Sequence, residues 1–116
     1  MKFTKMQGTG NDFIVVDQID SDFNLSKSLI RKLSDRNFGI GFDQLLIIEK
    51  SDSHNADFKY RIFNADGGEV EQCGNGARCF YKYIKNYGLS NNLTIKVETL
   101  SGIISQIGRA SCRERV

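Results

Sequence analysis

No apolar run in the chain exceeds four residues, and one run of that length is Leu45-Leu46-Ile47-Ile48. A run this short is typical of a buried β-strand, because a membrane-spanning helix needs roughly 18 or more apolar residues. It therefore predicts a strand over residues 43–49 inside a hydrophobic core. The chain has 116 residues, of which 40% are apolar and 26% charged, and this is the composition of one globular domain.

Further strands are predicted on both sides of this run. Residues 2–6 and 12–18 are rich in β-formers, and Gly8 and Gly10 separate them. Residues 57–63 alternate between apolar and basic side chains, and the turn segment 64–68 links them to a short strand at 69–72. A last hairpin is expected from residues 93–99 and 103–106.

Two helices are predicted, over residues 26–38 and 75–87. Ser26 is a suitable N-cap for the first. In the second, Ala77, Phe80, Tyr81 and Ile84 recur at helical spacing, so this helix should be largely buried and should end at Gly88. Many strands with only two helices predict an α+β fold, with antiparallel pairing across the tight 64–68 turn.

Cys73 is the candidate reactive group. It lies between a predicted strand and the Gly74-Asn75-Gly76 start of the second helix, where the helix dipole and unpaired N–H groups favour a thiolate and can bind a carboxylate. An inert core cysteine is the alternative, and it is the preferred interpretation of Cys79. The six-residue spacing of these cysteines and the isolated His54, expected in a solvated loop, argue against a zinc site.

Two glycine-rich segments are candidate ligand loops. Gly8-Thr9-Gly10 has Phe13 where a dinucleotide-binding loop has its third glycine, and no strand–glycine–helix order follows. We therefore do not expect a Rossmann site and prefer a turn that presents Asn11 to a ligand. Gly39-Ile40-Gly41-Phe42-Asp43-Gln44 is a turn that leads into the buried strand. Taken alone, Gln44 could bind a ligand or simply cap the strand.

The last ten residues, 107–116, differ in character from the rest. They carry three Arg and one Glu, which fits a basic helical end, an exposed tail or a weak nucleic-acid patch. We favour a non-native segment, because the string resembles the translation of a sequencing-library adapter. The expected domain is then 1–106, incomplete at its C-terminal end, and Cys112 has no function. A formal charge of +2 gives no reason to expect nucleic acid.

The cellular compartment is predicted from the N-terminus and the cysteines. Lys2 and Lys5 are followed by Gly8 and Asn11 rather than by the apolar core of a signal peptide. Three cysteines, an odd number, fit free thiols better than a disulfide framework. We therefore expect a cytoplasmic protein that associates with neither membranes nor nucleic acid.

Three segments in order resemble the diaminopimelate epimerase family. They are Lys5 to Phe13, Gly39 to Gln44, and Tyr60 to Gly67 running into Gln72-Cys73-Gly74-Asn75-Gly76-Ala77-Arg78-Cys79. The resemblance covers residues 1–106. Gln7 and Thr9 stand where the family more often has His and Leu, and these departures are mild.

The resemblance implies a fold of two similar lobes, each with antiparallel strands wrapped around a central helix, here 75–87. It implies an epimerase without cofactor or metal that interconverts LL- and meso-2,6-diaminopimelate for lysine and peptidoglycan synthesis. Cys73 would be one of two catalytic cysteines, and the helix N-terminus at Gly74 and Asn75 would bind the α-carboxylate. Full-length relatives are expected to be homodimers.

The same resemblance implies that Asn11, Gln44 and Asn64 bind the polar groups of the substrate. The second catalytic cysteine belongs to the other lobe, so this chain alone should not epimerise, and apolar surface should be exposed where that lobe packs. The alternatives are a same-fold proline-racemase-like or phenazine-biosynthesis-like isomerase, and a non-catalytic half-protein. A thiol-redox role is a further alternative, for which Cys79 is poorly placed.

Overall fold

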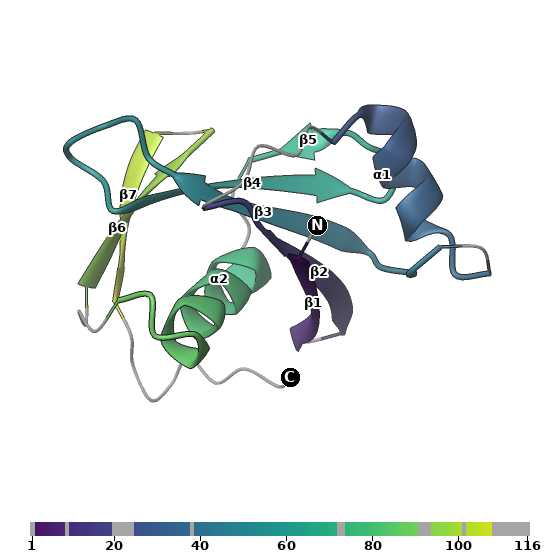
Figure 1. Cartoon of the computed structure of the whole chain (residues 1–116), viewed down its shortest axis with the longest axis horizontal. Helices are drawn as coiled ribbons and strands as arrows, with labels where there is room; N and C mark the ends of the chain where they lie inside the picture. The colour runs from purple at the N-terminus through teal and green to yellow at the C-terminus, as the bar shows by residue number, and fades with distance from the viewer. Residues whose placement is uncertain are drawn as a thin grey trace.

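A mixed β-sheet, with one helix against each of its faces, forms the part of the chain that the computed structural model describes (Figure 1). The described residues are 2–8, 10–19, 25–37, 39–71, 74–90, 94–100 and 102–107. Within them, the helices are α1 (Lys27–Ser34) and α2 (Gly74–Asn86). The strands are β1 (Lys2–Gly8), β2 (Asn11–Asp17), β3 (Gln44–Lys50), β4 (Phe58–Asn64), β5 (Glu69–Val70), β6 (Thr94–Thr99) and β7 (Gly102–Ile107).

The described strands follow the order β1-β2-β3-β4-β6-β7, and β5 pairs with β4 beside this path. The α+β class predicted from the sequence is confirmed. Four of the strand pairs are antiparallel, and two, β2 with β3 and β4 with β6, are parallel. Each parallel pair is joined by a connection that contains a helix: α1 lies between β2 and β3, and the short strand β5 and α2 lie between β4 and β6. Such a connection returns the chain to the end of the sheet at which the first strand of the pair began.

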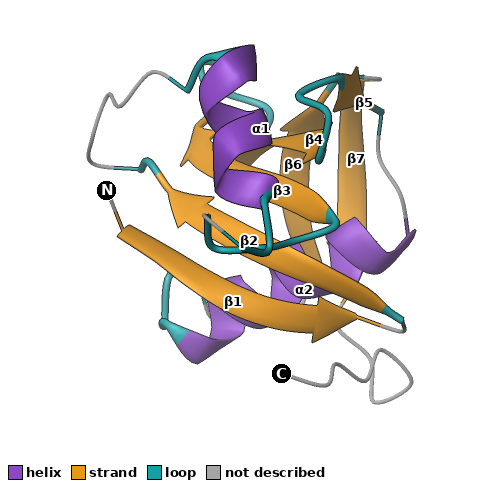
Figure 2. Cartoon of the chain, turned by 90° about the vertical axis from the view of Figure 1, so that its right-hand side faces the viewer, coloured by secondary structure: helices purple, strands orange, loops and turns teal. Residues whose placement is uncertain are grey.

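The two helices cover opposite faces of the sheet (Figure 2). On the α2 face the core contains Phe13, Val15, Leu46 and Ile48, which pack with Cys79, Phe80, Tyr83 and Ile84 of α2. On the α1 face it contains Ile14, Val16, Leu45 and Ile47, which pack with Ile30. Strands β2 and β3 are thus buried on both faces, which explains why each carries a continuous apolar run.

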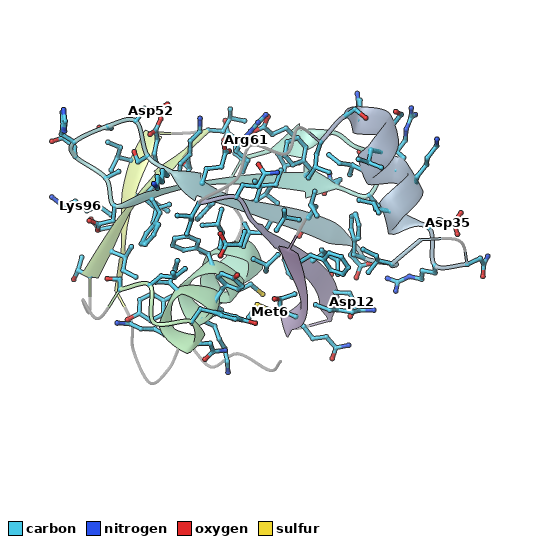
Figure 3. All side chains as sticks on the ribbon, viewed as in Figure 1. Met6, Asp12, Asp35, Asp52, Arg61 and Lys96 are labelled. Carbon is cyan, nitrogen blue, oxygen red and sulfur yellow. The ribbon has the colours of Figure 1, made fainter. Side chains whose placement is uncertain are left out.

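The α2 face of the sheet extends across β4, β1 and β6. Tyr60 and Ile62 of β4 are buried in the same core cluster as α2, as the alternation over 57–63 predicts. Met6 of β1 is also in this cluster, and Figure 3 shows it between β1 and α2. Helix α2 therefore packs into the concave centre of the strands, which confirms the expectation of a buried central helix.

Helix α1 is shorter than predicted. Its start is confirmed, since the Ser26 Oγ accepts a hydrogen bond from the Leu29 N–H at 3.1 Å. Its predicted end at residue 38 is wrong: the helix ends at Ser34, and the N–H groups of Ile40 and Gly41 donate to the Leu33 carbonyl. The chain thus turns back over the last turn of the helix and enters β3. Phe38 lies outside the described residues.

Helix α2 occupies 74–86, within one residue of its predicted bounds, and Gly88 follows with a left-handed φ of 63°. Strand β7 continues to Ile107, one residue past the predicted domain end. The interpretation of 107–116 as a non-native tail stays a prediction, because residues 108–116, Cys112 among them, lie outside the described residues. His54 is exposed in a turn, as expected.

None of the helices in the described ranges is long and apolar enough to span a membrane. Five large hydrophobic side chains of the described residues are exposed, on β1, after α2 and in the β6–β7 hairpin. They are Phe3, Tyr87, Leu89, Leu100 and Ile103. Whether a second lobe covers any of them stays a prediction.

Candidate active site

Three of the predicted ligand residues lie at one end of the sheet. Asn11 is the first residue of β2, Gln44 is the first of β3, and Asn64 is the last of β4. Strand β2 is parallel to β3 and β4 is antiparallel to it, so these positions meet at the same end. The register places Gln44 next to Phe13 on one side and directly opposite Asn64 on the other.

All three side chains belong to the face that α2 covers. Asn11 lies two residues before Phe13, Gln44 two residues before Leu46, and Asn64 two residues after Ile62. Phe13, Leu46 and Ile62 are packed with α2 in one core cluster. Because alternate residues of a strand share a face, the three amides form a polar margin of that core.

Gln44 and Asn64 are in direct contact. The Gln44 Nε2 donates a hydrogen bond to the Asn64 Oδ1 at 3.1 Å, and the bond is partly buried. An amide whose oxygen accepts such a bond presents its nitrogen as a donor. The pair can therefore offer oriented N–H groups to a carboxylate at the edge of the core.

Helix α2 begins at Gly74, a short way along the chain from this end of β4. Strand β5 pairs with β4 beside Asn64, with Glu69 opposite Phe63, and α2 begins four residues after β5 ends at Val70. The first turn of α2 has no acidic residue, so nothing on the helix offsets the positive end of its dipole. Such an end attracts anions.

The structure tests the prediction for Cys79 but not the prediction for Cys73. Cys73 lies outside the described residues, and so does the side chain of Asn75, so the roles predicted for Cys73, Gly74 and Asn75 stay predictions. Cys79 is fully buried in the α2 core cluster. The interpretation of Cys79 as a core residue is confirmed.

An ionic group on the opposite face of β2 and β3 from the amides was not predicted from the sequence. Arg36 donates from Nη1 to the Asp12 Oδ2 at 3.1 Å and from Nη2 to the Asp43 Oδ1 at 3.0 Å. The hydrogen bond from Gln7 lowers the pKa of the Asp12 carboxyl most, and the hydrogen bond from Arg36 lowers it further. The available signal was that Asp12 follows Asn11 and Asp43 precedes Gln44 in the two glycine-rich segments.

A second ion pair lies on the sheet face away from α2, where Figure 3 shows Arg61. Arg61 donates to both carboxylate oxygens of Glu69, at 3.0 and 2.8 Å, and this pairing lowers the pKa of Glu69. The pair borders a surface hollow of about 310 Å³, and Asn11, Gln44 and Asn64 are not among the described residues that line it. The hollow is lined by Lys59, Arg61, Glu69, Glu98, Thr99 and Leu100.

Comparison with known proteins identifies the family. A family model described as diaminopimelate epimerase matches residues 3–109, which include all three amides and Cys73. The chain belongs to the diaminopimelate epimerase family. It is 60% identical over 104 residues to the diaminopimelate epimerase of Nitrosomonas europaea and 56% identical over 104 residues to that of Nitrosospira multiformis.

These diaminopimelate epimerases are much longer than this chain. The matches cover 90% of the chain but only 38% of the Nitrosomonas europaea protein and 37% of the Nitrosospira multiformis protein. The chain therefore spans little more than a third of the length of these curated relatives.

Solved structures show that the fold extends beyond diaminopimelate epimerases. A methylitaconate-delta-isomerase superposes with a TM-score of 0.68 at 14% identity, covering 97% of this chain and 61% of that one. A Bacillus anthracis protein of the PhzF phenazine-biosynthesis family gives 0.66 at 23%, covering 97% and 36%. A hydroxyproline epimerase from Agrobacterium vitis gives 0.68 at 12%, covering 93% and 37%. At these identities the likeness concerns the fold alone.

Proposed function

We propose that this chain is one lobe of a diaminopimelate epimerase, which interconverts LL- and meso-2,6-diaminopimelate without a cofactor. The observation that carries the proposal is the family match over residues 3–109, because it spans every segment predicted to hold a site residue. The alignment of Asn11, Gln44 and Asn64 at one end of the sheet supports it further.

The proposed reaction inverts one α-carbon by two proton transfers. The Cys73 thiolate takes the α-proton from one face, so that the Cα–H bond breaks and its electron pair stays on carbon. A thiol on the opposite face then donates its proton to that carbon. Cys73 serves as acid or base according to the direction of the reaction, and the second thiol comes from the other lobe of the enzyme.

The carbanion must be stabilised electrostatically, because no cofactor withdraws its charge. In this proposal the backbone N–H groups at Gly74 and Asn75 bind the α-carboxylate as charge develops on it. The lack of acidic residues in the first turn of α2 supports this role. Asn11, Gln44 and Asn64 bind the remaining polar groups of the substrate and orient it.

We also propose a cytoplasmic location. A catalytic thiol must stay reduced, and the cytoplasm is a reducing compartment. Its partners there are diaminopimelate and, in the complete two-lobe enzyme, a second copy of the same polypeptide.

The experiment compares the chain with a complete enzyme. In D₂O with meso-diaminopimelate, the 116-residue chain should bind without exchanging the α-proton. A chimera in which residues 1–107 replace the matched segment of the Nitrosomonas europaea relative should exchange it. Cys73→Ala should abolish exchange by the chimera, and Cys79→Ala should not. Exchange by the chain alone that is lost on Cys73→Ala would contradict the need for a second lobe.

The choice of substrate is tested with the same chimera. The fold is shared with a hydroxyproline epimerase and a PhzF-family protein, so trans-4-hydroxyproline and proline are the informative competitors. Exchange with meso-diaminopimelate and not with either imino acid supports the proposal. A preference for an imino acid overturns it.

A further inference from the structure

Arg36 joins the start of β2 to the residue just before β3. Its Nη1 donates to the Asp12 Oδ2 at 3.1 Å and its Nη2 to the Asp43 Oδ1 at 3.0 Å. The same two aspartates are joined directly: the Asp12 N–H donates to the Asp43 Oδ2 at 2.8 Å, and the Asp43 N–H donates to the Asp12 carbonyl at 2.9 Å. We call these four contacts the Arg36 bridge.

The Arg36 bridge and the predicted ligand amides lie on opposite faces of the same strands. Asp12 and Asp43 alternate with Ile14 and Leu45, which pack on the α1 face. Asn11 and Gln44 are their chain neighbours, so they point to the α2 face. Any shift of Asp12 against Asp43 along the strands is therefore transmitted directly to the spacing of Asn11 and Gln44.

Arg36 is held in place by the segment that follows α1. The Gly39 N–H donates to the Asp35 carbonyl at 2.8 Å, and the Gly41 N–H donates to the Leu33 carbonyl at 3.0 Å. A Cβ built on Gly41 would lie 3.1 Å from the Arg36 Cγ, so the backbone at 41 approaches the arginine closely. Figure 3 shows Asp35, the residue that precedes Arg36 in the chain, on the same side of the molecule as Asp12.

We propose that Arg36 is a positioning residue for diaminopimelate binding, an inference that rests on the proposed function. Its guanidinium fork compensates two carboxylates that otherwise face each other as like charges. By fixing them it fixes the spacing of Asn11 and Gln44 on the opposite face. Within the described residues the hydrogen bonds of Arg36 go to Asp12 and Asp43, so it acts on Asn11 and Gln44 through the two strands.

The test measures meso-diaminopimelate binding to the full 116-residue chain by NMR titration. Arg36→Met should weaken binding about tenfold, because it removes the cation that the two carboxylates share. Arg31→Met is the matched control, since Arg31 is an exposed arginine of α1 outside the bridge, and it should bind like the original chain. Urea unfolding of each variant separates loss of binding from loss of folding.

A rescue variant distinguishes positioning from a general structural effect. Arg36→Met with Asp43→Asn removes one of the two like charges and keeps an acceptor for the Asp12 N–H. Its affinity should return to within about threefold of the original. Unchanged binding in Arg36→Met, or a rescue variant no better than Arg36→Met alone, overturns the proposal.

A readout without ligand keeps the inference separate from the proposed function. The side-chain amide signals of Asn11 and Gln44 should move in Arg36→Met and stay in place in Arg31→Met. If the original chain does not bind meso-diaminopimelate, the proposed function loses its support, and these signals still decide the positioning role. Unmoved signals in Arg36→Met overturn that role.

Discussion

Gln44 donates a hydrogen bond to Asn64 across the β3–β4 pair, at 3.1 Å and directly in register. The two residues are 20 positions apart in the chain and were each predicted to bind the substrate. Their contact makes them one unit, because the orientation of each amide depends on the other. Substitutions at either position therefore test both residues.

Asn64→Asp should separate the two functions of the Asn64 amide. The carboxylate can still accept from the Gln44 Nε2, so the free energy of unfolding at pH 7 should change by no more than about 1 kcal/mol. The donor is lost and a negative charge faces the ligand carboxylate, so meso-diaminopimelate binding should fall at least about tenfold. Urea unfolding and NMR titration measure the two effects. Asn55→Asp, in an exposed turn, is the control, and equal binding by both variants would contradict the proposed role.

The strands were predictable because their signals are local. The run at 45–48 indicates burial on both faces of β3, and the alternation at 58–62 indicates that Phe58, Tyr60 and Ile62 share one face of β4; the structure bears out both. The end of α1 was not predictable in the same way. No glycine or proline stands between Ser34 and Gly39 to end the helix. The chain nevertheless leaves the helix at Ser34, because Ile40 and Gly41 bond back to Leu33, a contact that depends on where β3 lies.

The candidate site, too, could be predicted from the sequence only in part. Asn11, Gln44 and Asn64 could be named from their motifs, yet only the sheet register shows that they share one end and one face. Arg36 was missed because its partners Asp12 and Asp43 are 24 and 7 residues away and are brought together by the parallel β2–β3 pair. Contacts of this kind follow from topology rather than from local pattern.

Leu45→Ala and Leu46→Ala should destabilise the chain to a similar degree. Both leucines are fully buried, Leu45 against the α1 side and Leu46 against the α2 side. Each truncation should lower the free energy of unfolding by roughly 2–5 kcal/mol. Leu100→Ala is the control, because this side chain is 59% exposed and should change stability by about 0.5 kcal/mol at most. If either leucine substitution left the free energy of unfolding nearly unchanged, the corresponding face of β3 would be exposed to solvent.

Gly41→Ala should cost more stability than Gly88→Ala. Both glycines have a left-handed φ, 81° and 63°, so an alanine at either position costs about 1 kcal/mol from backbone strain. A Cβ at 88 meets open space, whereas a Cβ at 41 lies 3.1 Å from the Arg36 Cγ. Crowding therefore adds to the cost at 41, which should reach about 2 kcal/mol or more in urea unfolding. Equal losses of stability in Gly41→Ala and Gly88→Ala would show that the Arg36 side chain moves aside freely.

Cys79 should resist alkylation in the folded chain. Its side chain is 0% exposed, so iodoacetamide can reach it only when α2 detaches from the sheet. Labelling should be at least about a hundredfold slower than in urea-unfolded chain. Trypsin cleaves after Arg78, so mass spectrometry can follow Cys73 and Cys79 in separate peptides. Rapid labelling of Cys79 under native conditions would contradict the packing of α2.

Ionisation of Tyr83 should lower the free energy of unfolding in alkaline solution. Its hydroxyl donates to the Asp17 Oδ2 at 2.9 Å, and burial, followed by this hydrogen bond, raises its pKa above the usual value of about 10. Below pH 10 the phenol is protonated in both the folded and the unfolded chain. Above pH 10 only the unfolded chain ionises, so the free energy of unfolding falls as the pH rises.

Tyr83→Phe should remove this pH dependence while keeping the ring stacked on Tyr87, 4.4 Å away. At pH 8 the variant should be less stable by about 1 kcal/mol, because Asp17 loses a donor. Between pH 9 and pH 11 the difference from the original chain should shrink by about 1 kcal/mol. Asp17→Asn keeps an acceptor and removes the charge, so it should reduce the pH dependence without abolishing it, since burial is the larger cause. A constant difference between Tyr83→Phe and the original chain across this range, measured by urea unfolding at each pH, would show that Tyr83 ionises as readily in the folded chain as in the unfolded one.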